Sequence, residues 1–356
     1  MLQIILAIIL VILLLVVGFS IYNMELINSI RTRGVTKTKI PIFTGIKDFN
    51  IISNETYNTS DKNSSSYKAI NDTPSINQQS GAEYTYNFWL YKDGNKYGSS
   101  SCPRLGNFNT DQGISETDNK QTVLFVKGNT DTAKYKNICG KDKTDIIIKN
   151  PLVKLERCGK NLTVEFNTVS NIDAIREKST VGVCDGAVDT WNEANSHKLT
   201  LSGLDSHVFD KKWNMITICI QDTYPTDPYP VRNKVRCRIY VNTGLELDTY
   251  VDGKLNGDTY NNNKTLLKLN KGHLHIAPIV RAPETQDDLV HRPTKEEGLM
   301  MADMSYYNYI LDSNEIDNLF NVGYSNRVSP PPGGDIKGKE YVKADKPTSK
   351  MFNMRE

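Results

Sequence analysis

The segment "GLMMADMSYYNYILDSNEIDNLFN", residues 298–321, changes its hydrophobic period halfway along. The first half alternates, so that Met304 and Tyr306 would face one side of a strand while Ser305 and Tyr307 face the other. The second half repeats apolar residues at helical spacing. The segment therefore predicts a strand that runs directly into a short helix.

The predicted helix, residues 312–320, has signals at both ends. Asp312 or Ser313 can cap its N-terminus, and acidic residues follow in the first turn, where the helix dipole favours negative charge. Gly323 supplies a stop signal just beyond the last apolar residue. A helix of one or two turns is the expected end of this domain.

Residues 81–325 contain about ten short runs rich in β-branched and aromatic residues, with polar turns between them. In "EYTYNFWLYKDG", for example, Tyr84, Tyr86 and Phe88 alternate onto one face. Long helical periodicity is absent before residue 312. The pattern predicts an all-β fold, a two-sheet antiparallel sandwich of the jelly-roll type with a short C-terminal helix.

The N-terminus carries an uncharged apolar run, Leu2–Tyr22, which is long enough to span a hydrocarbon core of about 30 Å. Residues 1–22 are therefore expected to form a retained transmembrane helix in contact with the lipid bilayer. No basic residue precedes this run, and four basic residues follow it: Arg31, Arg33, Lys37 and Lys39. By the positive-inside rule, the C-terminal domain is expected on the cytosolic side of a single-pass protein.

Two further segments lack a core pattern. Residues 23–80 begin as a basic juxtamembrane stretch and continue as a polar sequence rich in Asn, Ser and Thr, which predicts a tether. Residues 326–356 contain prolines, glycines and mixed charge, and are expected to form a tail. The chain has 43 Lys and Arg against 41 Asp and Glu, so that no electrostatic footprint for nucleic acid is present.

The order of the segments resembles the concanavalin A-like lectin/glucanase superfamily in its laminin-G-like form. The resemblance covers about residues 82–324 and rests on "EYTYNFWLYKDG", "VLFVKGN", "FDKKWNMITICI", "RCRIYVN", "TYVDGKL", "LHIAP" and "MADMSYYNYILDSNEIDNLF". The stretch from Gln221 to Thr249 departs from it, because it is longer than a simple hairpin. The resemblance implies that the C-terminal helix lies across an end of the sandwich and covers apolar residues that the last strand leaves open.

Members of that superfamily include glucanases, which use three carboxylates of one strand. Here Glu246 and Asp248 match two of the places, and Tyr250 or Val251 occupies the third. A retaining glycosidase needs two carboxyl groups about 5–5.5 Å apart, one of them a proton donor. We therefore expect no enzyme activity and no catalytic residue, and glycoside hydrolysis is the remote alternative.

Candidate metal sites are weak. His273 and His275 alternate onto one strand face without a third ligand at a regular spacing. The Asp- and Asn-containing loop "NGDTYNNN", residues 256–263, offers oxygen atoms that suit calcium, although such loops are more often solvated turns. No cofactor is expected, and calcium stays an open alternative.

Six cysteines lie in the expected domain, and an even number suits either three disulfides or free thiols. The strands around Cys219 and Cys237 are expected to pair. Ile216, Ile218 and Ile220 form the apolar set of the first strand, which turns Cys219 to the opposite face. In the second strand Cys237 belongs to the apolar set and faces the core. Because the two sulfurs then lie on different sides of the sheet, we predict that they are not bonded to each other.

Three aromatic residues in loop-like stretches, Trp191, Tyr224 and Tyr229, are candidates for stacking on sugar rings or for contact with a protein partner. Loop packing is the alternative. Anchor, Asn/Lys/Ile-rich composition and laminin-G-like domain together are similar to membrane-associated virion proteins of large DNA viruses. The resemblance implies a minor capsid or virion membrane protein that links an internal membrane to the capsid shell. A glycan-binding lectin on a cell or virion surface is the alternative function.

Overall fold

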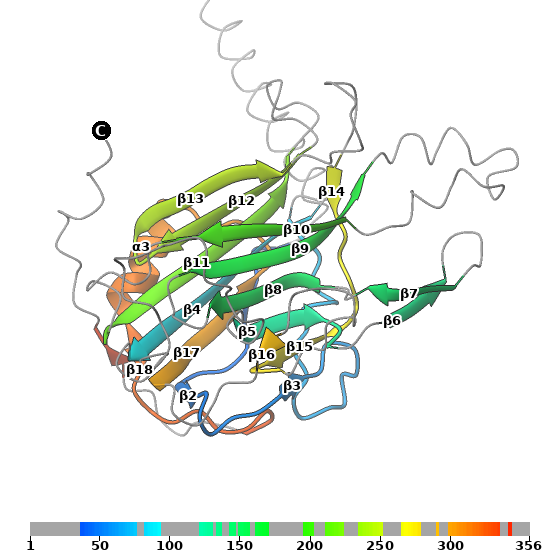
Figure 1. Cartoon of the computed structure of the whole chain (residues 1–356). Coiled ribbons are helices and arrows are strands. Elements are labelled where there is room, and N and C mark those ends of the chain that lie inside the picture. The colour runs from blue at the N-terminus through cyan, green and yellow to red at the C-terminus, as the bar shows by residue number, and fades with distance from the viewer. Residues whose placement is uncertain are drawn as a thin grey trace, which may run out of the picture.

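The computed structural model describes residues 36–76, 82–93, 121–130, 133–136, 142–146, 149–156, 161–170, 195–202, 211–223, 234–251, 265–278, 290–291, 298–334 and 341–343. These residues form two sheets that pack face to face around one apolar core, with a helix on the outer side of one sheet (Figure 1). All strand pairs of the two sheets are antiparallel except one short parallel pair. The predicted two-sheet sandwich with a short C-terminal helix is therefore confirmed.

The seven-stranded sheet has the order β1-β17-β4-β11-β12-β13, and β2 also pairs with β17. Its strands are β1 (Lys39–Pro41), β2 (Ile46–Asp48), β4 (Glu83–Asp93), β11 (Trp213–Asp222), β12 (Val235–Val241), β13 (Gly244–Val251) and β17 (Gly298–Tyr307).

The eight-stranded sheet has the order β10-β9-β8-β5-β15-β3, with β14 beside β9 and β16 parallel to β5. Its strands are β3 (Glu55–Tyr57), β5 (Gln121–Gly128), β8 (Lys149–Glu156), β9 (Leu162–Ser170), β10 (Asn195–Leu201), β14 (Thr265–Leu267), β15 (His273–Ile276) and β16 (Val290–His291).

Two small two-stranded sheets complete the described strands: β6 (Ala133–Lys136) with β7 (Asp142–Ile146), and β18 (Tyr324–Ser325) with β19 (Tyr341–Val342). The helix α3 covers Ser313–Val322.

The core between the sheets follows the alternation of the sequence. On β4, Tyr84, Tyr86 and Phe88 all point into it, as predicted. Tyr86 packs against Phe125 of the opposite sheet with ring centroids 5.3 Å apart, and Phe88 contacts the same ring edge to face at 5.5 Å. Aromatic pairs of this kind stabilise a core beyond their area burial.

The predicted caps of the helix are confirmed. The Asp312 side chain accepts a hydrogen bond from the Glu315 backbone N–H (2.8 Å), and the Glu315 side chain accepts one from the Asp312 N–H (3.0 Å). This reciprocal arrangement is a capping box. The helix ends at Gly323, whose φ of 84° is left-handed, and a side chain there would collide with the carbonyl of Val342.

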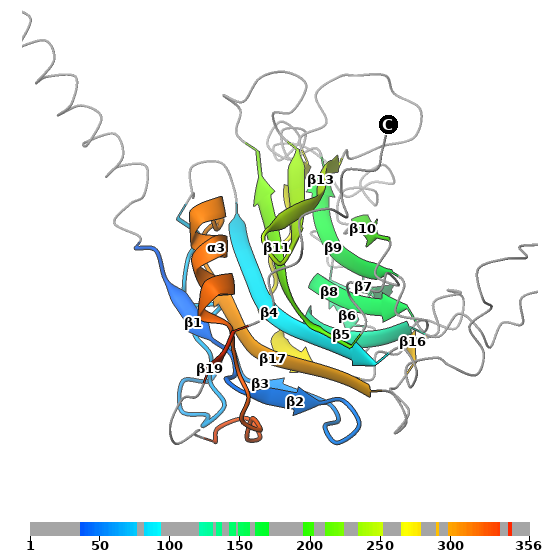
Figure 2. The same ribbon diagram turned by 90° about the vertical axis from the view of Figure 1, so that its left-hand side faces the viewer.

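The location of the helix corrects the expectation that it lies across an end of the sandwich. It packs on the outer face of the seven-stranded sheet, beside β4 and β17 and away from the other sheet (Figure 2). Phe320 stacks on Trp89 of β4 with ring centroids 5.6 Å apart, and Ile316 is buried in the same cluster. The seven-stranded sheet is therefore apolar on both faces in this region, and the helix removes the outer apolar side chains from water.

The expected tether is also corrected. Residues 39–57 add a strand to the edge of the seven-stranded sheet, a second strand to β17 and a third to the eight-stranded sheet. Apolar side chains from this segment and from the loop that follows are buried in the main core: Ile40, Ile42, Phe43, Phe49, Tyr57 and Ile70. The described part of residues 23–80 therefore belongs to the sandwich, because burial of these side chains offsets the entropy of ordering the polar residues between them.

The expected tail is corrected in the same way. The N–H of Ile46 donates to the carbonyl of Arg327 (2.6 Å), and the N–H of Ser329 donates to the carbonyl of Ile46 (2.8 Å). Further along, β19 pairs with β18 directly after the helix. The described residues beyond 325 are therefore fixed to the sandwich by backbone hydrogen bonds.

The two described cysteines are free thiols and, as predicted, they are not bonded to each other. In the β11–β12 pair, Cys219 lies opposite Arg238 and Cys237 lies opposite Ile220. Cys237 is buried in the core between the sheets, whereas Cys219 belongs to the cluster under the helix. The other four cysteines lie outside the described residues.

Within the described residues, no helix is both long and apolar enough to cross a membrane. The predicted anchor, residues 1–22, lies outside them.

Candidate functional site

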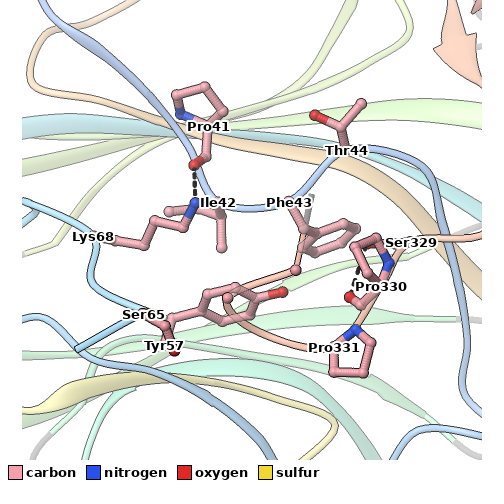
Figure 3. A pocket seen from close by; sticks show the side chains of 12 residues that line it. Pro41, Ile42, Phe43, Thr44, Tyr57, Ser65, Lys68, Ser329, Pro330 and Pro331 are labelled. Carbon is pink, nitrogen blue, oxygen red and sulfur yellow. Dashed lines mark hydrogen bonds between the residues drawn. The ribbon is translucent and has the colours of Figure 1, made fainter. Parts of the chain in front are cut away.

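A pocket of about 250 Å³ opens where the N-terminal segment, the loop after β3 and the C-terminal segment meet (Figure 3). Each of these three parts of the chain contributes one wall. None of the three was expected to fold from the sequence alone, so that the site depends on contacts between the two ends of the described chain.

The first wall is residues 41–44, which comprise the last residue of β1 and the three residues after it. The backbone N–H groups of Ile42 and Phe43 both donate to the carbonyl of Met304 on β17, at 2.8 and 3.3 Å. At this point β17 carries a bulge at Asp303, whose φ is 48°. One carboxylate oxygen of Asp303 accepts from the Gly45 N–H at 2.7 Å, and the bulge therefore holds the wall in place.

The second wall begins at Tyr57, the last residue of β3. Its ring stacks against Phe43 with centroids 6.5 Å apart and lies in the pocket (Figure 3). The residue is only 2% exposed. Burial and the charge of Glu55 both raise the pKa of Tyr57, so that the hydroxyl stays protonated at neutral pH.

The loop after β3 brings Lys68 to the same wall. Asn58 starts the loop as an Asx turn, because its side-chain oxygen accepts from the N–H groups of Ser60 and Asp61 at 2.8 and 2.7 Å. The Lys68 ammonium then donates to the carbonyl of Pro41 (2.8 Å) and lies 5.8 Å from the centre of the Tyr57 ring. One positive charge is thus held at the pocket.

The third wall is residues 329–334, "SPPPGG". The buried ammonium of Lys47 donates to the carbonyl of Pro330 (2.9 Å) and forms an ion pair with Glu55 (2.6 Å). Desolvation lowers the pKa of Lys47, and the hydrogen bond and charge of Glu55 oppose that effect. Gly333 approaches Ser65 so closely that a Cβ there would lie 2.7 Å from the serine hydroxyl. A glycine is therefore required for the wall to close.

The residues predicted to stack on sugar or contact a partner, Trp191, Tyr224 and Tyr229, lie outside the described residues, as does the calcium candidate loop 256–263. The pocket residues gave only a faint signal in the sequence. Ile40 and Ile42 alternate in "KIPIF", and "SPPPGG" has the composition of a turn. Runs this short do not distinguish a strand from a linker.

The carboxylates of β13 do not form a pair. Leu247 lies opposite Ile239 and Leu245 lies opposite Tyr240, which leaves Glu246 as an unpaired bulge residue. Asp248 uses both carboxylate oxygens to accept from Arg236, at 2.8 and 2.6 Å. The hydrogen bonds from Arg236 lower the pKa of Asp248, whereas burial raises that of Glu246.

His273 and His275 lie on one face of β15, as predicted, with ring centroids 6.3 Å apart. The Nδ1 of His273 accepts from the Thr59 N–H (3.3 Å), and the Nδ1 of His275 lies 3.0 Å from the Thr56 hydroxyl. Desolvation lowers the pKa of His275 to about 4. One ring nitrogen of each histidine is therefore hydrogen-bonded, and the described residues contain no group of three or more His, Cys, Asp or Glu placed to hold a metal ion.

No protein-family model matches the sequence, and no curated protein matches it. Among solved structures, the receptor-binding domain of botulinum neurotoxin type G is similar at 11% identity, with a TM-score of 0.33 over 70% of this chain. The receptor-binding domain of botulinum neurotoxin D is similar at 8% identity, with a TM-score of 0.35 over 70% of this chain.

The serotype D ligand-binding domain in complex with N-acetylneuraminic acid is similar at 9% identity, with a TM-score of 0.34 over 69% of this chain. This chain covers 41% of the first two structures and 38% of the third. Similarity at this level does not identify a ligand or a function, and the sandwich is established by its own strand pairing.

Proposed function

We propose that this chain is a membrane-anchored, non-enzymatic interaction module of a large DNA virus particle, in which the sandwich links an internal membrane to the shell above it. The observation that carries the proposal is the incorporation of residues 39–57 into both sheets. The domain thus begins almost directly after the expected anchor instead of after a long flexible tether.

The number of residues between the expected anchor and the sandwich limits how far the sandwich can move from the membrane. Roughly 13 residues separate the apolar run Leu2–Tyr22 from the first described residue, and fully extended they span at most about 45 Å. A sandwich held this close to a bilayer cannot explore a large volume. Such a short connection suits a structural protein that holds a membrane close to a neighbouring protein layer. It suits a receptor that searches for distant ligands less well.

The β13 carboxylates support the non-enzymatic part of the proposal. Both carboxylate oxygens of Asp248 accept hydrogen bonds from Arg236, and Glu246 lies in a β-bulge. The assignment to a virus particle is supported by the resemblance of the anchor, composition and domain to virion membrane proteins.

The test is the orientation of the full chain in sealed vesicles derived from the endoplasmic reticulum. Ile51 is 80% exposed, so that an Ile51→Cys variant offers a thiol that a membrane-impermeant maleimide can reach. Val328→Cys, at 82% exposure, is the matched second site, and the wild-type chain gives the background of its own cysteines. We expect both variants to label without detergent and the chain to remain with the membrane in alkaline carbonate.

Release of the chain by carbonate would remove the anchor from the proposal. Labelling of both variants only after detergent would place the sandwich on the lumenal side and exclude a shell-facing role. In purified particles, chemical cross-linking should join the sandwich to a shell protein, and cross-links exclusively between copies of this chain would contradict the linking role.

Glycan binding is the second candidate function. It is supported by the confirmed two-sheet architecture, which the lectin resemblance implies, and by the three loop aromatics Trp191, Tyr224 and Tyr229. A glycan array with the full chain, repeated with all three residues changed to alanine, tests it. Binding lost in the triple variant would favour the lectin, and an array without signal would exclude it.

A further inference from the structure

Aromatic side chains gather at one end of the outer face of the seven-stranded sheet. The ring of Trp213 on β11 stacks on Tyr324 of β18 with centroids 4.6 Å apart, and the ring of Tyr91 on β4 lies 5.5 Å from that of the tryptophan. These three side chains are only half-buried, in contrast to Trp89, which contacts Tyr324 and is 2% exposed. The apolar cluster beneath α3 therefore reaches the surface at this end of the sheet.

Two valines extend this surface. Val342 of β19 lies opposite Tyr324 and is 37% exposed, and Val322, the last residue of α3, is 54% exposed. Directly opposed residues of an antiparallel pair share a face, so that Val342 continues the aromatic surface. We call Tyr91, Trp213, Val322, Tyr324 and Val342 the aromatic patch. Exposed apolar patches with a polar rim are typical of interaction sites, and Trp and Tyr are enriched among the residues that carry most of the binding energy of protein interfaces.

The rim of the aromatic patch is positively charged. Lys211 and Lys212 directly precede the tryptophan, Lys343 directly follows the valine of β19, and all three are exposed. Two acids of the described chain lie close by, and both are engaged. Asp93 pairs with Lys211 at 3.8 Å, and Asp303 accepts hydrogen bonds from two backbone N–H groups. Such a rim favours a partner segment that carries Asp or Glu beside its apolar side chain.

The aromatic patch lies away from the point where the chain arrives from the expected anchor. Lys37, the second described residue, pairs with Glu315 in the first turn of α3 at 3.4 Å, whereas the patch lies around the C-terminal end of this helix, near β19 (Figure 2). The 10 residues of the helix, at a rise of about 1.5 Å each, separate the two places by roughly 15 Å. A sandwich anchored through its N-terminal segment therefore carries the patch on a side that a protein layer next to the membrane can reach.

We propose that the aromatic patch is the surface through which the sandwich contacts the shell, and that it binds a segment of the shell protein in which acidic residues flank an aromatic or aliphatic side chain. The inference rests on the proposed linking function and identifies the surface that performs it. The apolar side chain of the partner packs on the rings of Trp213 and Tyr324, and its acidic neighbours pair with the lysines of the rim.

The experiment is site-directed photo-cross-linking in purified particles. Val322→Cys and Val342→Cys each carry a benzophenone maleimide at the aromatic patch, and the wild-type chain gives the background of its own cysteines. Leu269→Cys is the matched control site, because Leu269 is 57% exposed and lies between β14 and β15 of the other sheet. The cross-linked peptides are identified by mass spectrometry.

A second set of particles tests the charge of the rim. The double variant Lys212→Glu, Lys343→Glu is combined with Val322→Cys, and Lys198→Glu in the same background is the matched control, because Lys198 is an exposed lysine of β10 in the other sheet. We expect both patch sites to cross-link to an acidic segment of a shell protein, and Leu269→Cys to give at most about a tenth of their yield. The double reversal should lower the yield about tenfold or more, because like charges then face each other, and Lys198→Glu should change it less than about twofold.

The outcomes separate this inference from the proposed function. Shell cross-links from Leu269→Cys alone would overturn the aromatic patch as the docking surface and leave the linking function intact, and absence of shell cross-links at every site would contradict both. An unchanged yield after the double reversal, or a cross-linked peptide without Asp or Glu, would overturn the acidic partner. An acidic glycan that the array shows to bind the wild-type chain but not the double reversal would assign the patch to glycan binding and overturn the protein partner.

Discussion

The substitution Cys237→Ser tests the assignment of faces on the β11–β12 pair. Cys237 is fully buried between the sheets, and no hydrogen bond reaches its sulfur from the described residues. Serine has nearly the same shape but carries a hydroxyl that must give up its bonds to water. A buried hydroxyl without a partner costs about 1–3 kcal/mol in mutational series.

The neighbouring cysteine supplies the matched control. Cys219 faces the opposite side of the sheet, and the Thr85 hydroxyl lies 3.5 Å from its sulfur. A serine at this position can donate to the Thr85 oxygen, so that its hydroxyl is satisfied. Cys219→Ser should therefore cost less than about 1 kcal/mol.

Thermal unfolding of the full chain in mild detergent distinguishes the two variants. For a domain of this size, 1 kcal/mol shifts the melting temperature by about 2–4 °C, so that Cys237→Ser should lower it by roughly 2–12 °C. The shift for Cys219→Ser should be clearly smaller. Equal shifts, or a larger one for Cys219→Ser, would show that the reasoning from strand faces and partners is wrong.

Four further outcomes are expected. Asp312→Ala removes the capping box of α3 and should cost about 0.5–2 kcal/mol in denaturant unfolding; an unchanged midpoint would deny the cap a role. Asp303→Ala removes the carboxylate that accepts from Gly45 and Ser325, and should cost roughly 2 kcal/mol or more; a neutral result would mean that Asp303 does not hold the first wall in place. Burial raises the pKa of Asp222 from 3.8 to about 7, so that the folded chain binds a proton more tightly than the unfolded one and its stability should fall as the pH rises from about 4 to about 7; Asp222→Asn should flatten this slope, and a slope of opposite sign would contradict the assignment. β-Glucan hydrolysis should be absent, and activity that disappears in Glu246→Gln would restore the enzyme interpretation.

Local signals in the sequence were enough for the longer strands and the helix. Strands β4, β11 and β17 are ten or eleven residues long, and their alternation indicates the inner and outer faces before any partner is known. The capping box and the glycine stop of α3 are contacts within one short segment, and they were predictable for the same reason. The separate faces of Cys219 and Cys237 follow from alternation alone.

Only the tertiary structure shows where these elements lie and that the segments near both ends of the described chain pack onto the sandwich. Strands β1, β2 and β3 have three residues each, too few for a period, and they exist because β17 and β15 offer unpaired backbone groups to them. Lys39 pairs with Tyr307 across most of the chain, a contact that no local pattern encodes. The pocket depends on the same long-range closure, since its walls come from segments that each look like linker. Alternation and helix caps depend on residues that are close in the sequence. The pairing of strands far apart in the chain depends instead on how much apolar surface the complete fold buries.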